Sequence, residues 1–93
     1  MSITKFQVAS VNSGDTKTID LGTSIINASV AVQGYTVSFG NTDHHVKTLD
    51  VQTSLSGISG SSVTVAATCT MEDNSNHKAY GKVDVLVIAE CDS

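Results

Sequence analysis

Apolar and polar residues alternate with a period of two through most of this chain, and short clusters of Gly, Asn, Asp and Ser separate the alternating segments. Successive side chains of a β-strand point to opposite faces of a sheet, so the alternation predicts strands that are buried on one face. Six strands are expected, at residues 3–11, 17–21, 28–39, 46–55, 62–71 and 80–91. No segment shows the periodicity of a helix. The sequence therefore predicts one all-β domain over residues 1–93, a six-stranded antiparallel β-sandwich.

The alternation also assigns individual side chains to the core. In the first expected strand, Phe6 and Val8 are assigned inward. In the third, the inward parity changes from even at Val32 to odd at Tyr35, which predicts a β-bulge at Gly34. The fifth strand alternates most regularly and is expected to bury Val63, Val65, Ala67, Cys69 and Met71.

The last expected strand departs from the pattern, because residues 83–91 are apolar on both faces through the middle of the segment. Its even positions place Leu86 and Ile88 between Asp84 and Glu90. A second apolar face needs a cover, and in a chain this short we expect that cover to be another copy. Leu86 and Ile88 are therefore the predicted oligomer interface, with the two acids at its rim.

Two cysteines, Cys69 and Cys91, permit one disulfide. If residues 62–71 and 80–91 form a hairpin, the two lie roughly nine residues apart along it, at about 3.3 Å per residue. A disulfide needs Cα atoms within about 7 Å. Both are expected to be reduced, core-facing thiols, which agrees with a cytoplasmic location.

Charge and hydropathy exclude two classes of binding partner. The formal net charge is −4, and the five basic residues are scattered lysines, Lys5, Lys17, Lys47, Lys78 and Lys82. Without arginine or a basic cluster, nucleic acid is not an expected partner. No secretory h-region and no apolar run of about 20 residues is present, so no membrane partner is expected either.

The cluster Asp43, His44 and His45 is the local motif that could carry chemistry, since imidazole and carboxylate are common metal ligands. Adjacent strand residues point to opposite faces, so a metal would need a further ligand such as His77 or Asp73. We favour a solvated turn without metal, and no cofactor is expected. Residues 57–62 also lack the Gly-x-Ser-x-Gly spacing of a nucleophile elbow, so the protein is not expected to be an enzyme.

From residue 28 to residue 91 the order and spacing of features resemble the H-type lectin domain. The resemblance is carried by residues 30–35, 49–55, 63–70 and 85–90, which read VAVQGY, LDVQTSL, VTVAATCT and VLVIAE. It implies a six-stranded sandwich that trimerises through its sheets and binds sugars at loop ends between subunits. Family members place an arginine and an aromatic residue or histidine near the sugar, and a tryptophan near the last hairpin; this chain has no arginine and no tryptophan.

These observations predict a non-enzymatic, oligomeric β-sandwich binding module, with a trimer favoured, whose loops bind a glycan or another polar ligand. By loop position alone, the expected ligand-binding residues are Asp43, His44, His45 and His77. Two alternatives stay open. One is a structural or assembly accessory protein, of a phage or mobile-element type, without a small-molecule ligand; the other is a metal-dependent enzyme at the turn of Asp43, His44 and His45.

Overall fold

The computed structural model describes residues 2–40 and 45–92. Its seven strands are β1 (Ser2–Asn12), β2 (Thr16–Asp20), β3 (Ile25–Thr36), β4 (Val46–Ser59), β5 (Ser62–Asp73), β6 (Lys78–Tyr80) and β7 (Lys82–Asp92). All strand pairings are antiparallel, and the described residues contain no helix. The prediction of an all-β, antiparallel fold is confirmed, whereas the expected number of strands, six, is wrong.

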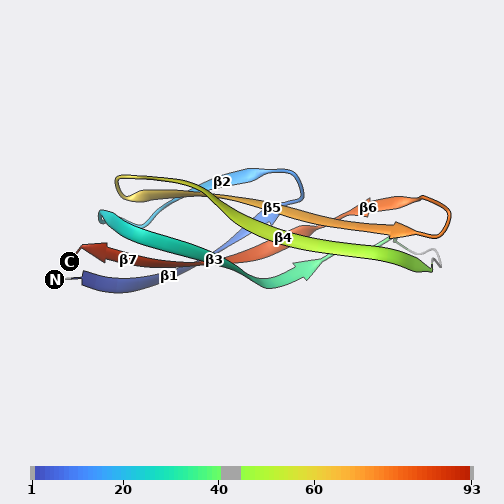
Figure 1. Cartoon of the computed structure of the whole chain (residues 1–93), viewed down its shortest axis with the longest axis horizontal. Coiled ribbons are helices and arrows are strands. Elements are labelled where there is room, and N and C mark those ends of the chain that lie inside the picture. The colour runs from blue at the N-terminus through green and yellow to red at the C-terminus, as the bar shows by residue number, and fades with distance from the viewer. Residues whose placement is uncertain (1, 41–44, 93) are drawn as a thin grey trace.

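The strands form two sheets that run along the long axis of an elongated molecule (Figure 1). One is three-stranded, in the order β1-β7-β3, and the other has the order β2-β5-β4, with β6 paired to β5. The molecule measures 54 × 17 × 17 Å. Both ends of the described chain lie at one end of the molecule, where Ser2 pairs with Asp92.

The core lies between the central strands of the two sheets, β5 and β7. Their odd-numbered residues point toward each other and are buried: Val63, Val65, Ala67, Cys69, Val83, Val85, Val87, Ala89 and Cys91. Most are small or β-branched, which suits two closely packed pleated surfaces. The inward assignment of the fifth strand is confirmed, except that Met71 is only partly buried.

The extra strand arises at Gly81, where the chain passes from the four-stranded sheet to the three-stranded sheet. Gly81 N donates to the Cys69 carbonyl, and Ser13 N donates to the Gly81 carbonyl, both at 2.9 Å. A Cβ built on Gly81 would lie 2.0 Å from the Thr36 carbonyl oxygen. The expected continuous strand 80–91 is therefore interrupted, because the backbone packs there at a distance that only glycine allows.

The crossover also corrects the expected hairpin. Only residues 70–72 of β5 pair with residues 78–80 of β6, whereas β7 pairs with β1 and β3 in the other sheet. Cys69 and Cys91 consequently lie in different sheets, and both are buried free thiols, as expected. Burial raises the pKa of the Cys69 thiol, which favours its protonated form.

The inward assignment of Phe6 and Val8 is wrong. In the pairing of β1 with β7, Phe6 lies opposite Ile88 and Val8 opposite Leu86, so all four side chains share the outer face. The inner face of β1 is formed by the odd positions, where Ala9 and Val11 are buried. The strand is apolar at both parities, so its pairing with β7 decides which set is buried.

The third strand follows its expected course more closely. The pairing of β3 with β7 shifts register between Val32 and Gly34, which confirms the bulge. The strand ends at Thr36 rather than at Phe39, although Val37 still packs against the core.

Candidate functional site

The start of β4, which follows His45, and the β5–β6 turn, which carries His77, lie at the end of the molecule away from the termini (Figure 1). Asp43 and His44 lie outside the described residues. His45 precedes β4, is exposed, and accepts a hydrogen bond on its carbonyl from Asn74 N at 3.2 Å. The backbone of His45 is thereby joined to the β5–β6 turn that carries His77, so the two loops are neighbours.

Asp73 organises that turn from a buried position. Its Oδ1 accepts hydrogen bonds from Ser75 N and His77 N, both at 2.8 Å, and its Oδ2 lies 2.9 Å from His77 Nδ1. Asn76 takes up the positive φ of 66° that the turn requires, a conformation that asparagine tolerates well. His77 was expected to contact a ligand, and the structure shows its imidazole bound to Asp73 within the turn.

A groove with a volume of about 410 Å³ lies on the outer face of the four-stranded sheet, beside this turn. It is lined by Thr48 and Asp50 from β4, Thr70, Met71 and Glu72 from β5, and Lys78 and Tyr80 from β6. Ligand sites of proteins range from about 300 to 1,000 Å³, so the groove can hold a small molecule.

Two cross-strand rows give the groove its shape. In one row Thr70 of β5 pairs with Asp50 on one side and Tyr80 on the other; in the second, Glu72 pairs with Thr48 and Lys78. Strands are about 4.8 Å apart, so the outer members of each row are separated by about 10 Å across the central strand. The groove is thus about as wide as two strand spacings.

The charged groups of the groove are bound to neighbouring side chains. The Glu72 carboxylate lies 3.7 Å from Lys47 Nζ and 4.0 Å from Lys78 Nζ. Asp50 Oδ1 accepts a hydrogen bond from Gln52 Nε2 at 2.9 Å. Surface pairs of this kind contribute little to stability, about 0–1 kcal/mol each, so they leave the groups able to exchange partners with a ligand.

Tyr80 is an aromatic residue that lines the groove, and 67% of its surface is accessible. Three-residue β6 buries Ala79 and therefore turns Lys78 and Tyr80 outward. We assigned Tyr80 to the start of the last strand and overlooked it as a site residue. The alternation of Lys78, Ala79 and Tyr80 directly before Gly81 was the signal that could have identified it.

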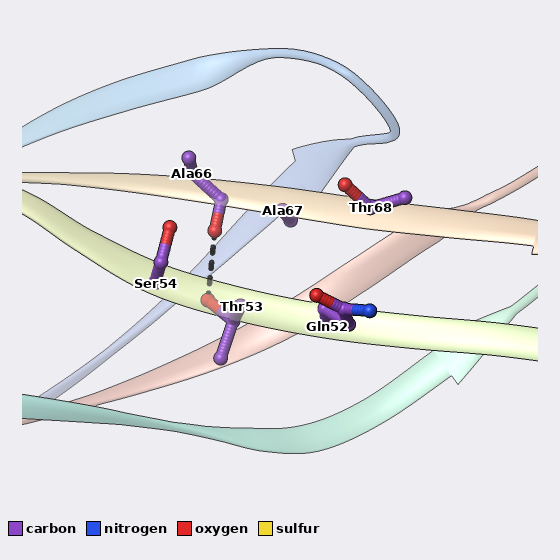
Figure 2. Close-up of a pocket in the computed structure, with 6 residues that line it drawn as sticks. All are labelled: Gln52, Thr53, Ser54, Ala66, Ala67 and Thr68. Carbon is purple, nitrogen blue, oxygen red and sulfur yellow. Dashed lines mark hydrogen bonds between the residues drawn. The ribbon is translucent and has the colours of Figure 1, made fainter.

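A second, smaller depression of about 70 Å³ lies further along the same two strands (Figure 2). Gln52 and Ser54 of β4 border it opposite Ala66 and Thr68 of β5. Thr53 Oγ1 donates to the Ala66 carbonyl at 2.9 Å. The depression is too small for an organic ligand by itself, but it extends the polar surface beyond the groove.

The opposite side of the molecule carries the predicted interface residues. Leu86 and Ile88 are partly buried on the outer face of β7. On one side they pair with Val8 and Phe6 of β1, and on the other with Ala31 and Ser29 of β3. Phe6 remains 65% exposed. We refer to Phe6, Val8, Ala31, Leu86 and Ile88 as the apolar face, which is larger than the sequence alone indicated.

Within residues 2–40 and 45–92, no three His, Cys, Asp or Glu side chains are grouped as metal ligands. The same residues include no helix long and apolar enough to cross a membrane. Comparisons with protein-family models, with curated proteins and with solved structures found no match to this chain.

Proposed function

We propose that this protein is a non-enzymatic, self-associating β-sandwich that binds carbohydrate in the groove between β4, β5 and β6. The observation that carries the proposal is the exposed ring of Tyr80 beside hydroxyl, carboxylate and ammonium groups. Sugars combine apolar C–H faces with hydroxyls around the ring. Such ligands suit an amphipathic aromatic ring accompanied by a few polar groups.

Each group then has a role in binding. The sugar ring stacks on Tyr80 above Thr70, its hydroxyls donate to the carboxylates of Asp50 and Glu72, and Lys78 donates to a sugar oxygen. Both carboxylates already interact with neighbouring side chains, so we assign them to hydrogen bonding rather than to catalysis. The resemblance to H-type lectin domains agrees with this ligand class but places the sugar at the loops.

A glycan array followed by isothermal titration of the best-bound glycan tests the binding. Removing the ring in Tyr80→Ala should weaken binding about fivefold, since an aromatic contact contributes roughly 1 kcal/mol. Tyr35→Ala is the matched control, because Tyr35 is the other exposed tyrosine and lies on β3 of the opposite sheet. Absence of binding to every glycan at millimolar concentration would refute the proposal.

The apolar face supports self-association. Its residues form one patch on the outer surface of the three-stranded sheet, where Phe6 and Val8 retain large exposed fractions. Contiguous apolar patches of this kind mark contact surfaces. The groove lies on the outer surface of the other sheet, so association through the apolar face leaves it accessible.

Sheet width favours three copies. A three-stranded sheet is about 14 Å wide, so three of them arranged as a triangular prism each lie about 4 Å from the axis. Packed sheets are about 10 Å apart, which corresponds to about 5 Å on each side of the midplane. A trimer can therefore close with the side chains of Leu86 and Ile88 filling its centre.

Light scattering coupled to size exclusion tests the assembly, with three times the chain mass expected. Phe6→Lys should shift the mass to that of one chain, because an unpaired ammonium cannot be buried in the apolar face. Val46→Lys is the control, since Val46 is also exposed but belongs to β4. A single-chain mass of the unaltered protein at high concentration would contradict self-association.

The same face favours a second candidate function, an assembly accessory protein whose apolar face binds a different protein. A single-chain mass together with absent glycan binding would support it. A metal-dependent enzyme at the turn of Asp43, His44 and His45 stays a prediction, which elemental analysis of the purified protein tests. Stoichiometric metal that is lost in His45→Ala would support it.

A further inference from the structure

The groove continues along the sheet as a longer polar surface. On β4 the side chains at Thr48, Asp50, Gln52 and Ser54 share the outer face, and their partners on β5 are Glu72, Thr70, Thr68 and Ala66. These eight residues, which we call the polar strip, connect the groove to the smaller depression. Seven of the eight have hydroxyl, amide or carboxylate side chains, at regular spacing on two neighbouring strands, and Ala66 is the exception.

Two irregularities define the length of the polar strip. The pairing of β4 with β5 shifts register between Val46 and Thr48 and again between Leu55 and Gly57, and it is regular in between. From Thr48 to Ser54 the strip is about 20 Å long at about 3.4 Å per residue. Several sugar units of an extended chain fit along this distance, whereas a single sugar occupies only the groove.

The charges of the strip favour a neutral ligand. Its two carboxylates, Asp50 and Glu72, are matched by Lys47 and Lys78, which both lie near Glu72. The whole chain has a net charge of −4, which repels polyanions at long range. Polysaccharides that carry carboxylate or sulfate groups are therefore disfavoured relative to neutral ones.

We propose that the polar strip binds a straight, neutral, β-linked glycan chain lying along β4 and β5, with one end stacked on Tyr80. The inference rests on the proposed carbohydrate function and names the ligand class of that site. The Gln52 amide can both donate and accept, and Thr68 and Ser54 add hydroxyls (Figure 2). These groups contact sugar units beyond the one held in the groove.

Titration with cellooligosaccharides and chitooligosaccharides of increasing length, from the disaccharide to the hexasaccharide, tests the inference. Affinity should rise by about tenfold along at least one series, because each added hydrogen bond contributes about 1 kcal/mol. Maltooligosaccharides of the same lengths are the control, since their α-linkages curve the chain away from a straight strip. Affinity that is independent of length, or equal for the curved series, would overturn the inference.

Ser54→Ala, at the end of the polar strip away from the groove, should lower the affinity for the hexasaccharide by about fivefold while leaving that for the disaccharide unchanged. Ser10→Ala is the matched control, because Ser10 is an exposed serine on β1 of the other sheet. Binding of short or branched glycans on the array, without binding of either straight series, would overturn this inference and leave the proposed function standing. Absence of all glycan binding would overturn both.

Discussion

At the residue scale, Gly81 has no space for a side chain at the point where the chain changes sheets. A Cβ there would lie 2.0 Å from the Thr36 carbonyl oxygen and 2.7 Å from Val37 Cβ. Neither atom can move without shifting the backbone at the end of β3. We expect Gly81→Ala to lower the free energy of unfolding by about 2 kcal/mol, within the range found for overpacked sites, as measured by urea denaturation.

Gly57→Ala provides the control for this substitution. Gly57 lies in β4, its φ is not positive, and a Cβ added there would meet no heavy atom within 4 Å. The free energy of unfolding should therefore change by less than about 0.5 kcal/mol. Equal effects of the two substitutions would show that the contact with Thr36 does not limit position 81.

The Cys69 thiol makes stability depend on pH in the alkaline range. Burial raises its pKa above the usual value of 9.0, so the folded state holds this proton more tightly than the unfolded state does. The contribution is complete below that value and is lost as the pH rises. Between about pH 8 and about pH 10, the free energy of unfolding should fall more for the unaltered protein than for Cys69→Ala. Parallel curves for the two proteins would contradict this assignment.

At the scale of elements, β6 depends on the turn that Asp73 holds. The strand has three residues, and among the residues that the structure describes it pairs only with β5. The buried Asp73 carboxylate binds both the backbone and the side chain of His77 just before it. Asp73→Ala should destabilise the protein by about 1–3 kcal/mol, because the backbone N–H groups of Ser75 and His77 lose the carboxylate that accepts their hydrogen bonds. Hydrogen exchange at residues 78–80 should accelerate, and glycan affinity should fall as Tyr80 loses its position.

Asn76→Gly separates this effect from general damage to the turn. Glycine adopts the positive φ of Asn76 without strain, so the turn, the exchange rates and the affinity should stay close to those of the unaltered protein. If Asp73→Ala left exchange in β6 unchanged, the pairing with β5 alone would be sufficient to hold the strand.

The elements themselves were largely predictable, because a period of two is unambiguous where only one parity is apolar. The odd residues of β5 and the bulge at Gly34 were identified on this basis. The pattern was insufficient for β1, where both parities are apolar and pairing with β7 decides the orientation of Phe6. Gly81 could not be recognised as a crossover, because the constraint comes from Thr36, distant in sequence.

The candidate site was predictable only as a region. The backbones of the segments that carry His45 and His77 are hydrogen-bonded, so these segments are neighbours, as expected from their loop positions. The sequence pattern does not indicate which side chains form hydrogen bonds within the turn itself, as His77 does with Asp73. His77 is bound to Asp73, while Tyr80 and Asp50 lie on either side of Thr70. This arrangement depends on the pairing of three strands, which the sequence of each strand does not specify.

At the scale of the whole molecule, the two outer faces have opposite character. The three-stranded sheet presents the apolar face, and the four-stranded sheet presents the groove and the polar strip. In a trimer joined through the apolar faces, the three grooves point outward and away from one another. Because the grooves face different directions, more than one can be occupied at once where glycan chains are long and flexible enough to reach around the trimer.

In this arrangement, the affinity of one groove for a soluble glycan and the retention of the whole trimer on a glycan layer are two different quantities. On a dense layer of such flexible chains, a second groove binds at high effective concentration, so retention should exceed that of a single site by about 10²–10⁴-fold. Phe6→Lys should abolish this gain, yet its affinity for a soluble oligosaccharide should match that of the unaltered protein, because Phe6 lies on the opposite sheet from the groove. Surface plasmon resonance on dense and sparse glycan layers, combined with titration in solution, measures both quantities. Equal retention of the two proteins on the dense layer would mean that the copies do not bind together, and the apolar face would then have to be assigned to a different partner.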